Sequence, residues 1–274
     1  MSRDRHLGNR RLLRRRWEED EAEPPRRRLP APTVTSPWSE EARSILAGAE
    51  VIACEPIPTG SNYTFAVALA DKLGARCLAV YKPRRGEVPL WDFPDGSLYR
   101  REYAAYVVSQ ALRWPFIPPT VIRDGPYGIG SMQFYVAPAD GVSYFQFRAQ
   151  HRRELRQITL FDHLVNNADR KVSHLIEDRA GQVWGIDHGL TFHEDWKLRT
   201  VVFDFCGQPI PPELLRDLRE LRADRLRAAA LQSELSGLLT AREIAVFFER
   251  LDRLLARRTF PELDPYRNVP RGFF

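Results

Sequence analysis

The sequence predicts a two-lobed α+β protein with a cleft between its halves. The first half is rich in strand-like runs, whereas the chain from about residue 151 carries the spacing of helices. Side chains that can do chemistry gather in two stretches, NNADRKVSHLI (166–176) and IDHGL (186–190). At 274 residues with 43% hydrophobic side chains, the chain can bury a real core, as one large domain or as two small lobes.

The first half is predicted to open with a helix and to continue as an antiparallel meander. The helix starts at Ser36-Pro37, with a capping residue, a proline at the first helical position and two glutamates in the first turn. Three strand-like runs follow, EVIACEPI, YTFAVALA and RCLAVYK, and a Lys-Leu-Gly-Ala turn separates the last two. A helix over 98–112 comes next, and the strands PTVIRD and MQFYVA end this half.

The second half is predicted to consist of helices around one hairpin. RELRQITLFDHLVNN has helical spacing, and the hairpin follows around VSHLIED and QVWGID. Further helices are expected near 212–222, 224–236 and 240–257. We therefore expect a strand-rich lobe over 37–138 and a helix-rich lobe over 139–274, preceded by a disordered tail over 1–36.

Most of the formal charge of +5 lies in this tail, which holds ten Arg against six acidic residues before residue 36. The tail is also Pro-rich and poor in large apolar residues, which favours disorder over an RNA- or membrane-binding arm. The rest of the chain is nearly neutral and predicts no specific nucleic-acid partner. No stretch approaches 18 consecutive apolar residues, and no apolar segment follows the N-terminal arginines, so we expect neither a membrane span nor a signal peptide. Three cysteines without close spacing fit unbridged thiols, and together these features predict a cytoplasmic protein.

The stretch 166–176 and the hairpin after it carry the residues that phosphoryl transfer needs. A helix ending at Asn166-Asn167 leads into a loop with Asp169 and Lys171, and the hairpin can return Asp187 beside them. One carboxylate can orient the attacking hydroxyl and accept its proton, a second can hold Mg²⁺, and the cation can bind the γ-phosphate.

The first half supplies complementary groups for a nucleotide. Gly60-Ser61 lies in a turn whose backbone N–H groups can cover phosphates. Lys82 ends a strand one hairpin later, and Glu102 lies in the first turn of the next helix, where it can pair with that lysine. Only four of the 41 basic residues are lysines, so Lys82 and Lys171 suggest places where a compact ammonium is preferred to a planar guanidinium.

These motifs resemble those of the kinase-like fold and, within it, the phosphatidylinositol 3-/4-kinase superfamily. NADRKVSHLI stands where that group has an Asn-x-Asp-Arg catalytic loop, GIDHGLTF where it has a metal-binding Asp-x-Gly, and AVYKP where it has the strand lysine. The run VYKPRRGEVPLWDFPDGSLYRREYAAY is further similar to an uncharacterised, mainly actinobacterial branch. The resemblance covers about residues 50 to 205.

The resemblance implies ATP-dependent transfer of the γ-phosphate, with Mg²⁺ or Mn²⁺, to an unidentified hydroxyl of a lipid, a protein or a small molecule. It implies Asp169 as base or hydroxyl-positioning group, Lys171 at the γ-phosphate and Asp187 on the metal. In the first half it implies Lys82 at the α- and β-phosphates, with Glu102 orienting that lysine.

Some positions depart from the kinase pattern. Five residues after Asp169, where kinases place a metal-binding Asn, this chain has His174, and an imidazole suits Mn²⁺ or Zn²⁺ better than Mg²⁺. The turn at Gly60 holds one glycine instead of a GxGxxG pattern, which is nearer to the lipid kinases. The apolar run from Gln133 to Val136 has the character of an inter-lobe hinge whose backbone can bind adenine.

Three other functions stay open at this point. A pseudokinase that binds nucleotide and regulates a partner would explain His174, and the same fold also supports nucleotidyl transfer. A zinc hydrolase is suggested by five of the six histidines, which lie between 151 and 193, although none of them forms an HExxH motif.

Overall fold

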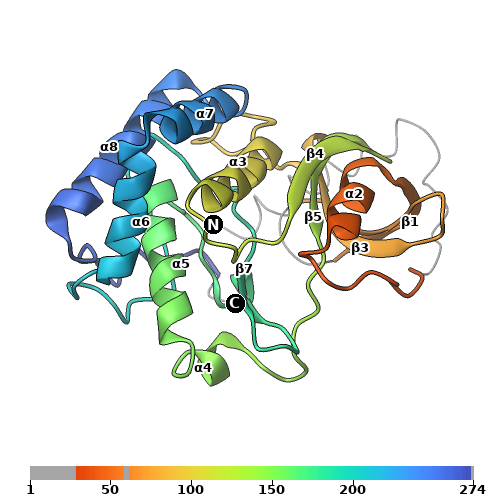
Figure 1. Ribbon diagram of the computed structural model, residues 1–274, viewed down its shortest axis with the longest axis horizontal. Helices are drawn as coiled ribbons and strands as arrows, with labels where there is room; N and C mark the ends of the chain where they lie inside the picture. Colours follow the sequence, from red (N-terminus) through yellow and green to blue (C-terminus); the bar gives the residue numbers. More distant parts are fainter. Residues whose placement is uncertain (1–28, 59–61, 273–274) are drawn as a thin grey trace, which may run out of the picture. The chain divides into compact units, whose positions relative to one another are not determined.

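A five-stranded antiparallel sheet forms the first half of the protein in the computed structural model, which describes residues 29–58 and 62–272 (Figure 1). The strands lie in the order β1-β2-β3-β5-β4. Their bounds are β1 (Glu50–Ile57), β2 (Thr64–Ala70), β3 (Arg76–Pro83), β4 (Thr120–Gly125) and β5 (Gly128–Phe134). The predicted antiparallel meander of the first three strands is confirmed by their register, in which Val67 lies opposite both Cys54 and Ala79.

Alternation of side chains along β3 decides which of its groups face the core. Alternate residues from Cys77 to Tyr81 are fully buried on one face of the strand. Lys82 lies on the opposite, less buried face and is paired in register with Ser131 of β5. The strand period therefore keeps the only lysine of β3 out of the buried layer.

Helix α2 (Glu40–Gly48) packs against β3, β4 and β5. Its N-cap is Ser39, whose Oγ accepts a hydrogen bond from the N–H of Ala42 at 3.0 Å. The predicted start at Ser36-Pro37 is therefore too early. The carbonyl of Ser36 instead accepts bonds from the N–H and Oγ of Ser39, at 3.4 and 3.1 Å, in a turn that precedes the helix.

The end of the predicted disordered tail also differs from the expectation. The N–H groups of Thr33 and Val34 donate to the carbonyl of Arg76 at 3.0 and 2.9 Å, and Val34 is buried. These contacts fix this segment beside the first residue of β3, because the Thr33 hydroxyl also accepts the N–H of Arg76 at 2.9 Å. Residues 1–28 lie outside the described residues.

Helices and one small hairpin make up the second half of the chain. Their bounds are α3 (Leu98–Ala111), α4 (Tyr144–Phe147), α5 (Arg152–Val165), β6 (Leu175–Glu177), β7 (Val183–Gly185), α6 (Pro212–Ala223), α7 (Arg225–Ser236) and α8 (Ala241–Arg257). The predicted helices and hairpin are confirmed, and the short α4 is an addition to them. Figure 1 shows α6 beside α8, and α8 also packs against α5 around a core that includes Phe161, Leu218 and Phe247. Within residues 29–58 and 62–272, each helix is too short or too polar to cross a membrane.

Contacts between Cα atoms divide the chain into two compact units. The strand unit comprises Met1–Tyr99 and Pro119–Tyr135, and the helical unit comprises Arg100–Pro118 and Val136–Phe274. Most of α3 therefore groups with the helices, although its sequence position favours the strand-rich lobe. Buried residues of α3 such as Ala104 and Val108 belong to the same hydrophobic core as the helices, and buried Arg101 is ion-paired with Glu243 of α8.

Replacing Gly130 by alanine is expected to destabilise the strand unit. A Cβ at this position would lie 2.7 Å from the Cα of Pro83 and closer still to the carbonyl oxygen of Lys82, so β3 and β5 would have to separate. We expect a loss of about 1 to 3 kcal/mol in the free energy of unfolding, measured by urea denaturation. Gly48→Ala is the control, because nothing lies within 4 Å of the new methyl group. Equal stability of the two variants would contradict the close approach of the strands.

Candidate active site

Helix α5 ends in two asparagines that set the path of the loop after it. Asn166 closes the helix with a left-handed φ of 55°, and its side chain binds the carbonyls of His193 and Asp195 at 3.0 and 2.6 Å. Asn167 is fully buried, and its Oδ1 accepts the N–H of Asp169 at 3.0 Å. The backbone of Asp169 is thereby fixed to the end of α5.

The β6–β7 hairpin brings Asp187 back to this loop. The N–H of Ile186 donates to the carbonyl of His174 at 3.0 Å, and Oδ2 of Asp187 lies 3.2 Å from Nε2 of the same histidine. Nδ1 of His174 accepts the N–H of Lys171 at 3.4 Å, so Nε2 is the nitrogen that donates to Asp187. Within the described part of the chain, no three His, Cys, Asp or Glu side chains gather as a metal-binding cluster.

Asp169 and Lys171 form an ion pair, with 2.9 Å between Oδ2 and Nζ and with side chains that are 20% and 24% exposed. Burial raises the pKa of the Asp169 carboxyl to about 6, the neighbouring Lys171 lowers it, and the negative charge of Asp187 raises it. Asp169 is therefore within electrostatic reach of both residues. A carboxylate of this kind is ionised at neutral pH and more basic than an ordinary aspartate.

Behind the loop, Arg170 and Asp162 form a buried ion pair that the sequence analysis missed. Their side chains are 0% and 2% exposed, and Nε and Nη2 of Arg170 each lie 2.8 Å from an oxygen of Asp162. The available signal was the charge inside LFDHLV, an otherwise mainly apolar run of α5. A charged residue in such a run is seldom fully buried without a partner.

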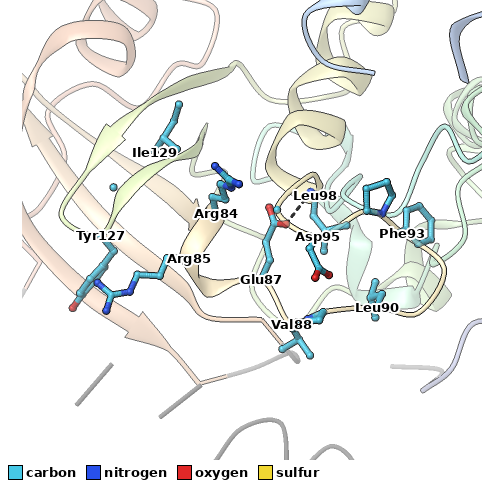
Figure 2. Close-up of a pocket in the computed structure, with 14 residues that line it drawn as sticks. Arg84, Arg85, Glu87, Val88, Leu90, Phe93, Asp95, Leu98, Tyr127 and Ile129 are labelled. Carbon is cyan, nitrogen blue, oxygen red and sulfur yellow. Dashed lines mark hydrogen bonds between the residues drawn. The ribbon is translucent and has the colours of Figure 1, made fainter. Parts of the chain in front are cut away.

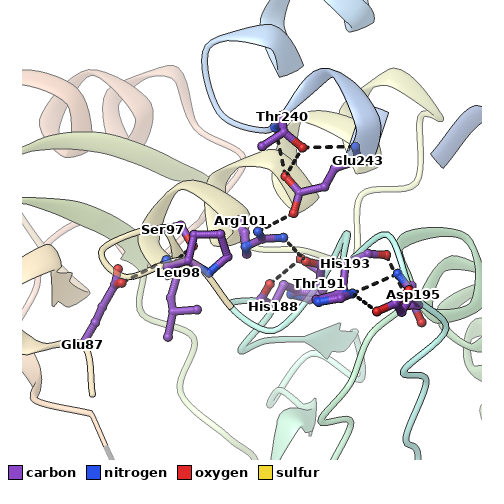
Figure 3. Close-up of polar contacts among 12 residues, drawn as sticks. Glu87, Ser97, Leu98, Arg101, His188, Thr191, His193, Asp195, Thr240 and Glu243 are labelled. Atoms are coloured by element: carbon purple, nitrogen blue, oxygen red, sulfur yellow. Dashed lines mark hydrogen bonds and ion pairs between the residues drawn. The ribbon is translucent and has the colours of Figure 1, made fainter. Parts of the chain in front are cut away.

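Helix α3 contributes two buried charged side chains to the segment after the hairpin. The N–H of His188 donates to Oε1 of Glu102 at 3.0 Å. Arg101 donates to the carbonyl of Thr191 at 2.6 Å and pairs with Glu243, as Figure 3 shows. Two successive residues of α3 therefore hold the backbone that follows the hairpin.

The residues predicted to bind phosphates lie in the strand unit or outside the described chain. Lys82 is at the end of β3, and Gly60 and Ser61 lie outside the described residues. The predicted pairing of Lys82 with Glu102 would join the two units and stays a prediction.

The predicted hinge residues occupy two different environments. Gln133 is buried within β5, where its Nε2 donates to Oγ1 of Thr120 at 2.9 Å. Val136 is half-buried and is the residue at which the chain re-enters the helical unit. The side chain of Gln133 is engaged within the sheet, so a base bound at this segment would have to use the backbone.

A pocket of 430 Å³ lies within the strand unit, and Figure 2 shows residues that line it. It lies between the segment 84–98 and the turn at 127–129, and none of the described residues predicted for the site lines it. Its Glu87 accepts the N–H groups of Leu98 and Tyr99 at 3.1 and 2.8 Å and so caps α3. The groups suited to catalysis thus lie in the loop and hairpin of the helical unit and not in this pocket.

Comparison with solved structures defines the class of fold. The structure of hydra Fam20 with sugar is similar, with a TM-score of 0.52 and 13% identity over 78% of this chain and 87% of that one. The Helicobacter pylori proinflammatory kinase CtkA has a TM-score of 0.46 and 13% identity over 75% and 93% of the two chains. The protein has a kinase-like fold, with an antiparallel sheet in its N-lobe and helices in its C-lobe, and this confirms the predicted fold class.

Sequence comparison then gives the family. Protein Rv2133c of Mycobacterium tuberculosis (strain ATCC 25618 / H37Rv) is 36% identical over 267 residues, which cover 84% of this chain and 95% of that protein. The chain belongs to the family of this mycobacterial protein. No family model matches the sequence.

Asp169→Asn is expected to stabilise the protein at neutral pH. Because the pKa of Asp169 is raised to about 6 in the folded protein, wild-type stability falls as the pH rises from about 4 to about 6. The Asn variant lacks this loss, so its advantage in free energy of unfolding should be near zero at about pH 4 and about 1 to 3 kcal/mol above about pH 7. Urea denaturation across this range measures it, with Asp252→Asn, at an exposed ion pair, as the control. An advantage that does not change with pH would contradict the raised pKa.

Proposed function

We propose that the protein is an ATP-dependent phosphotransferase that moves the γ-phosphate to a hydroxyl of a lipid, a protein or a small molecule. The observation that carries this proposal is the ion pair of Asp169 with Lys171, within electrostatic reach of Asp187. Two carboxylates and an ammonium are the groups that phosphoryl transfer uses. The kinase-like fold supports the same reading, and the motifs support placement in the phosphatidylinositol 3-/4-kinase-like superfamily.

Asp169 is assigned to the acceptor hydroxyl, which it orients and whose proton it accepts. Its raised pKa makes it a stronger base than an ordinary aspartate, while the carboxyl is still ionised at neutral pH. Lys171 supplies positive charge to the oxygens of the phosphoryl group in transfer. The two groups also support each other, because the 2.9 Å contact favours the ionised carboxylate.

Asp187 and His174 are assigned to a divalent metal. The side chain of Asp187 is 47% exposed, so its carboxylate is accessible to a cation that also binds phosphate oxygens. When bound, Mg²⁺ or Mn²⁺ neutralises charge on those oxygens. Nε2 of His174 lies 3.2 Å from Asp187 and would join it on the cation after losing the proton that it donates to that carboxylate, and an imidazole favours Mn²⁺ over Mg²⁺.

Binding of the nucleotide is assigned to residues outside the loop that carries Asp169 and outside the β6–β7 hairpin. Lys82 is assigned to the α- and β-phosphates, and the backbone N–H groups of Gly60-Ser61 to covering the phosphates. Glu102 is assigned to orienting Lys82, and backbone groups within 133–136 to the adenine. The order of these motifs along the chain, which resembles that of the lipid-kinase superfamily, supports the assignments.

A nucleotide-binding pseudokinase that regulates a partner is the second candidate function. It is favoured by the contact between His174 and Asp187, because Nε2 of the histidine occupies an oxygen that a metal would use. Nucleotidyl transfer, in which the α-phosphate is attacked, would use the same carboxylates with a different bound geometry. The position of the label in ATP separates these candidates from phosphoryl transfer.

The test is transfer or slow hydrolysis of label from ATP that carries it at the γ- or at the α-phosphate. Wild type is expected to release or transfer the γ-label, and Asp169→Asn and Asp187→Asn are each expected to lose about 100-fold or more of the rate. Asp252→Asn should match wild type, because it removes an exposed carboxylate paired with Arg222. Equal γ-label turnover in all variants would contradict the proposal. Transfer of the α-label would indicate nucleotidyl transfer. Binding of the nucleotide without any turnover would indicate a pseudokinase.

His174→Asn is expected to shift the metal preference toward Mg²⁺, because an amide oxygen is a harder ligand than an imidazole nitrogen. The ratio of turnover with Mn²⁺ to turnover with Mg²⁺ should fall about tenfold in the variant. Mn²⁺ affinity, measured by electron paramagnetic resonance in the presence of ADP, gives a readout that does not depend on turnover. His193→Asn is the matched control, since that ring also lies beside an aspartate, Asp195, at 3.9 Å. An unchanged ratio and affinity would remove His174 from the metal site.

A further inference from the structure

Arg170 is fully buried, and every hydrogen-bond donor of its side chain is used. The five acceptors are the two oxygens of Asp162, the carbonyls of His174 (3.1 Å) and Ile186 (2.9 Å), and Nε2 of His188 (2.8 Å). A guanidinium has five N–H donors, so these contacts account for all of them. Complete pairing is what allows this charge to be stable away from water.

The acceptors of Arg170 lie on both sides of Asp187 in the chain. Ile186 precedes Asp187 and His188 follows it, and both are bound by the same guanidinium. Arg170 itself directly follows Asp169. One side chain therefore connects the backbone next to the first aspartate with groups on either side of the second.

His188 is restrained through both its ring and its backbone. An arginine can only donate, so Nε2 of His188 must accept, and the ring proton is on Nδ1. The backbone of this histidine is fixed as well, because its N–H donates to Glu102 at 3.0 Å and its carbonyl accepts the Thr191 hydroxyl at 2.7 Å. The ring is fully buried and packs edge-on against Phe161.

Asp187 needs this support because of its backbone conformation. Its φ of 60° is left-handed, and residues other than glycine keep such a conformation only where the surroundings impose it. The bond of Arg170 to the carbonyl of Ile186 fixes the peptide before Asp187, and the bond from His188 to Glu102 fixes the peptide after it.

We propose that Arg170 is the positioning residue of the site: held by Asp162 and His188, it fixes Asp187 relative to Asp169 without touching nucleotide or acceptor. The inference rests on the proposed phosphotransfer, in which Asp187 binds the metal and Asp169 the hydroxyl. A displacement of about 1 Å between such groups can cost about 100-fold in rate. The guanidinium therefore acts on the reaction through geometry.

The test removes the hydrogen bond between Arg170 and His188 by substituting the histidine, and it leaves the Asp162–Arg170 ion pair intact. His188→Leu and His188→Met fill the space but lack a strong acceptor, and the flexible Met is the second choice should Leu prevent folding. His188→Gln keeps an acceptor oxygen and tests rescue. His163→Leu is the matched control, because it replaces another buried histidine of the helical unit, 2% exposed and outside these contacts. The measurements are kcat and KM for ATP, and amide hydrogen exchange over the segment 183–191.

The Leu and Met variants are expected to lose about tenfold or more in kcat, with KM for ATP within about threefold of wild type. Hydrogen exchange around Asp187 should accelerate in these two variants, and His188→Gln and the control should stay near wild type in both measurements. Unchanged kcat in the Leu and Met variants, unchanged exchange, or an equal kcat loss in the control would each overturn the inference. Failure of the proposed function has a different signature, since γ-label turnover would then survive Asp169→Asn and Asp187→Asn. Hydrogen exchange still decides whether His188 and Arg170 hold Asp187 in that case.

Discussion

The ion pair between Asp162 and Arg170 is the contact on which the geometry of the candidate site depends. Both side chains are removed from water, where an unpaired charge would be strongly unfavourable, so each requires the other. Asp162 belongs to α5 and Arg170 to the loop after it, and the guanidinium reaches the hairpin through the carbonyl of Ile186. A helix, a loop and a hairpin are thereby joined at one buried point, and none of them can shift without breaking charged hydrogen bonds.

The groups in front of this pair are kept in states that are unfavourable by themselves. Burial raises the pKa of Asp169, and Asp187 has a left-handed backbone, so neither would persist in a loosely packed loop. The ion pair with Lys171 offsets part of the free-energy cost of burying the Asp169 carboxylate. Charged groups that lower the stability of the fold are typical of functional sites, because their positions serve the reaction and not the folding of the chain. In an arginine-rich chain, the choice of lysine also fits a point charge for phosphate.

The sequence was sufficient for features that depend on local spacing. The strands β1 to β3 were recognisable from their apolar, β-branched composition, and the hairpin that carries Asp187 is short, so its return to the loop followed from its register. The apolar run around Asp162 signals that this carboxylate is buried, but its partner Arg170 lies eight residues away in a loop, and no spacing rule for helices predicts that pair. The grouping of α3 with the helices involves contacts between distant residues, such as Arg101 and Glu243, which lie 142 residues apart, and no local pattern reports such a contact.

Helix α3 makes the site dependent on the position of a single rigid element. Arg101 and Glu102 bind the segment after Asp187 at two points, the carbonyl of Thr191 and the N–H of His188. At the N-terminus of the same 14-residue helix, the carboxylate of Glu87 accepts the N–H groups of Leu98 and Tyr99. Arg101 is itself ion-paired with Glu243 of α8, so the backbone that follows Asp187 is tied to two helices of the helical unit.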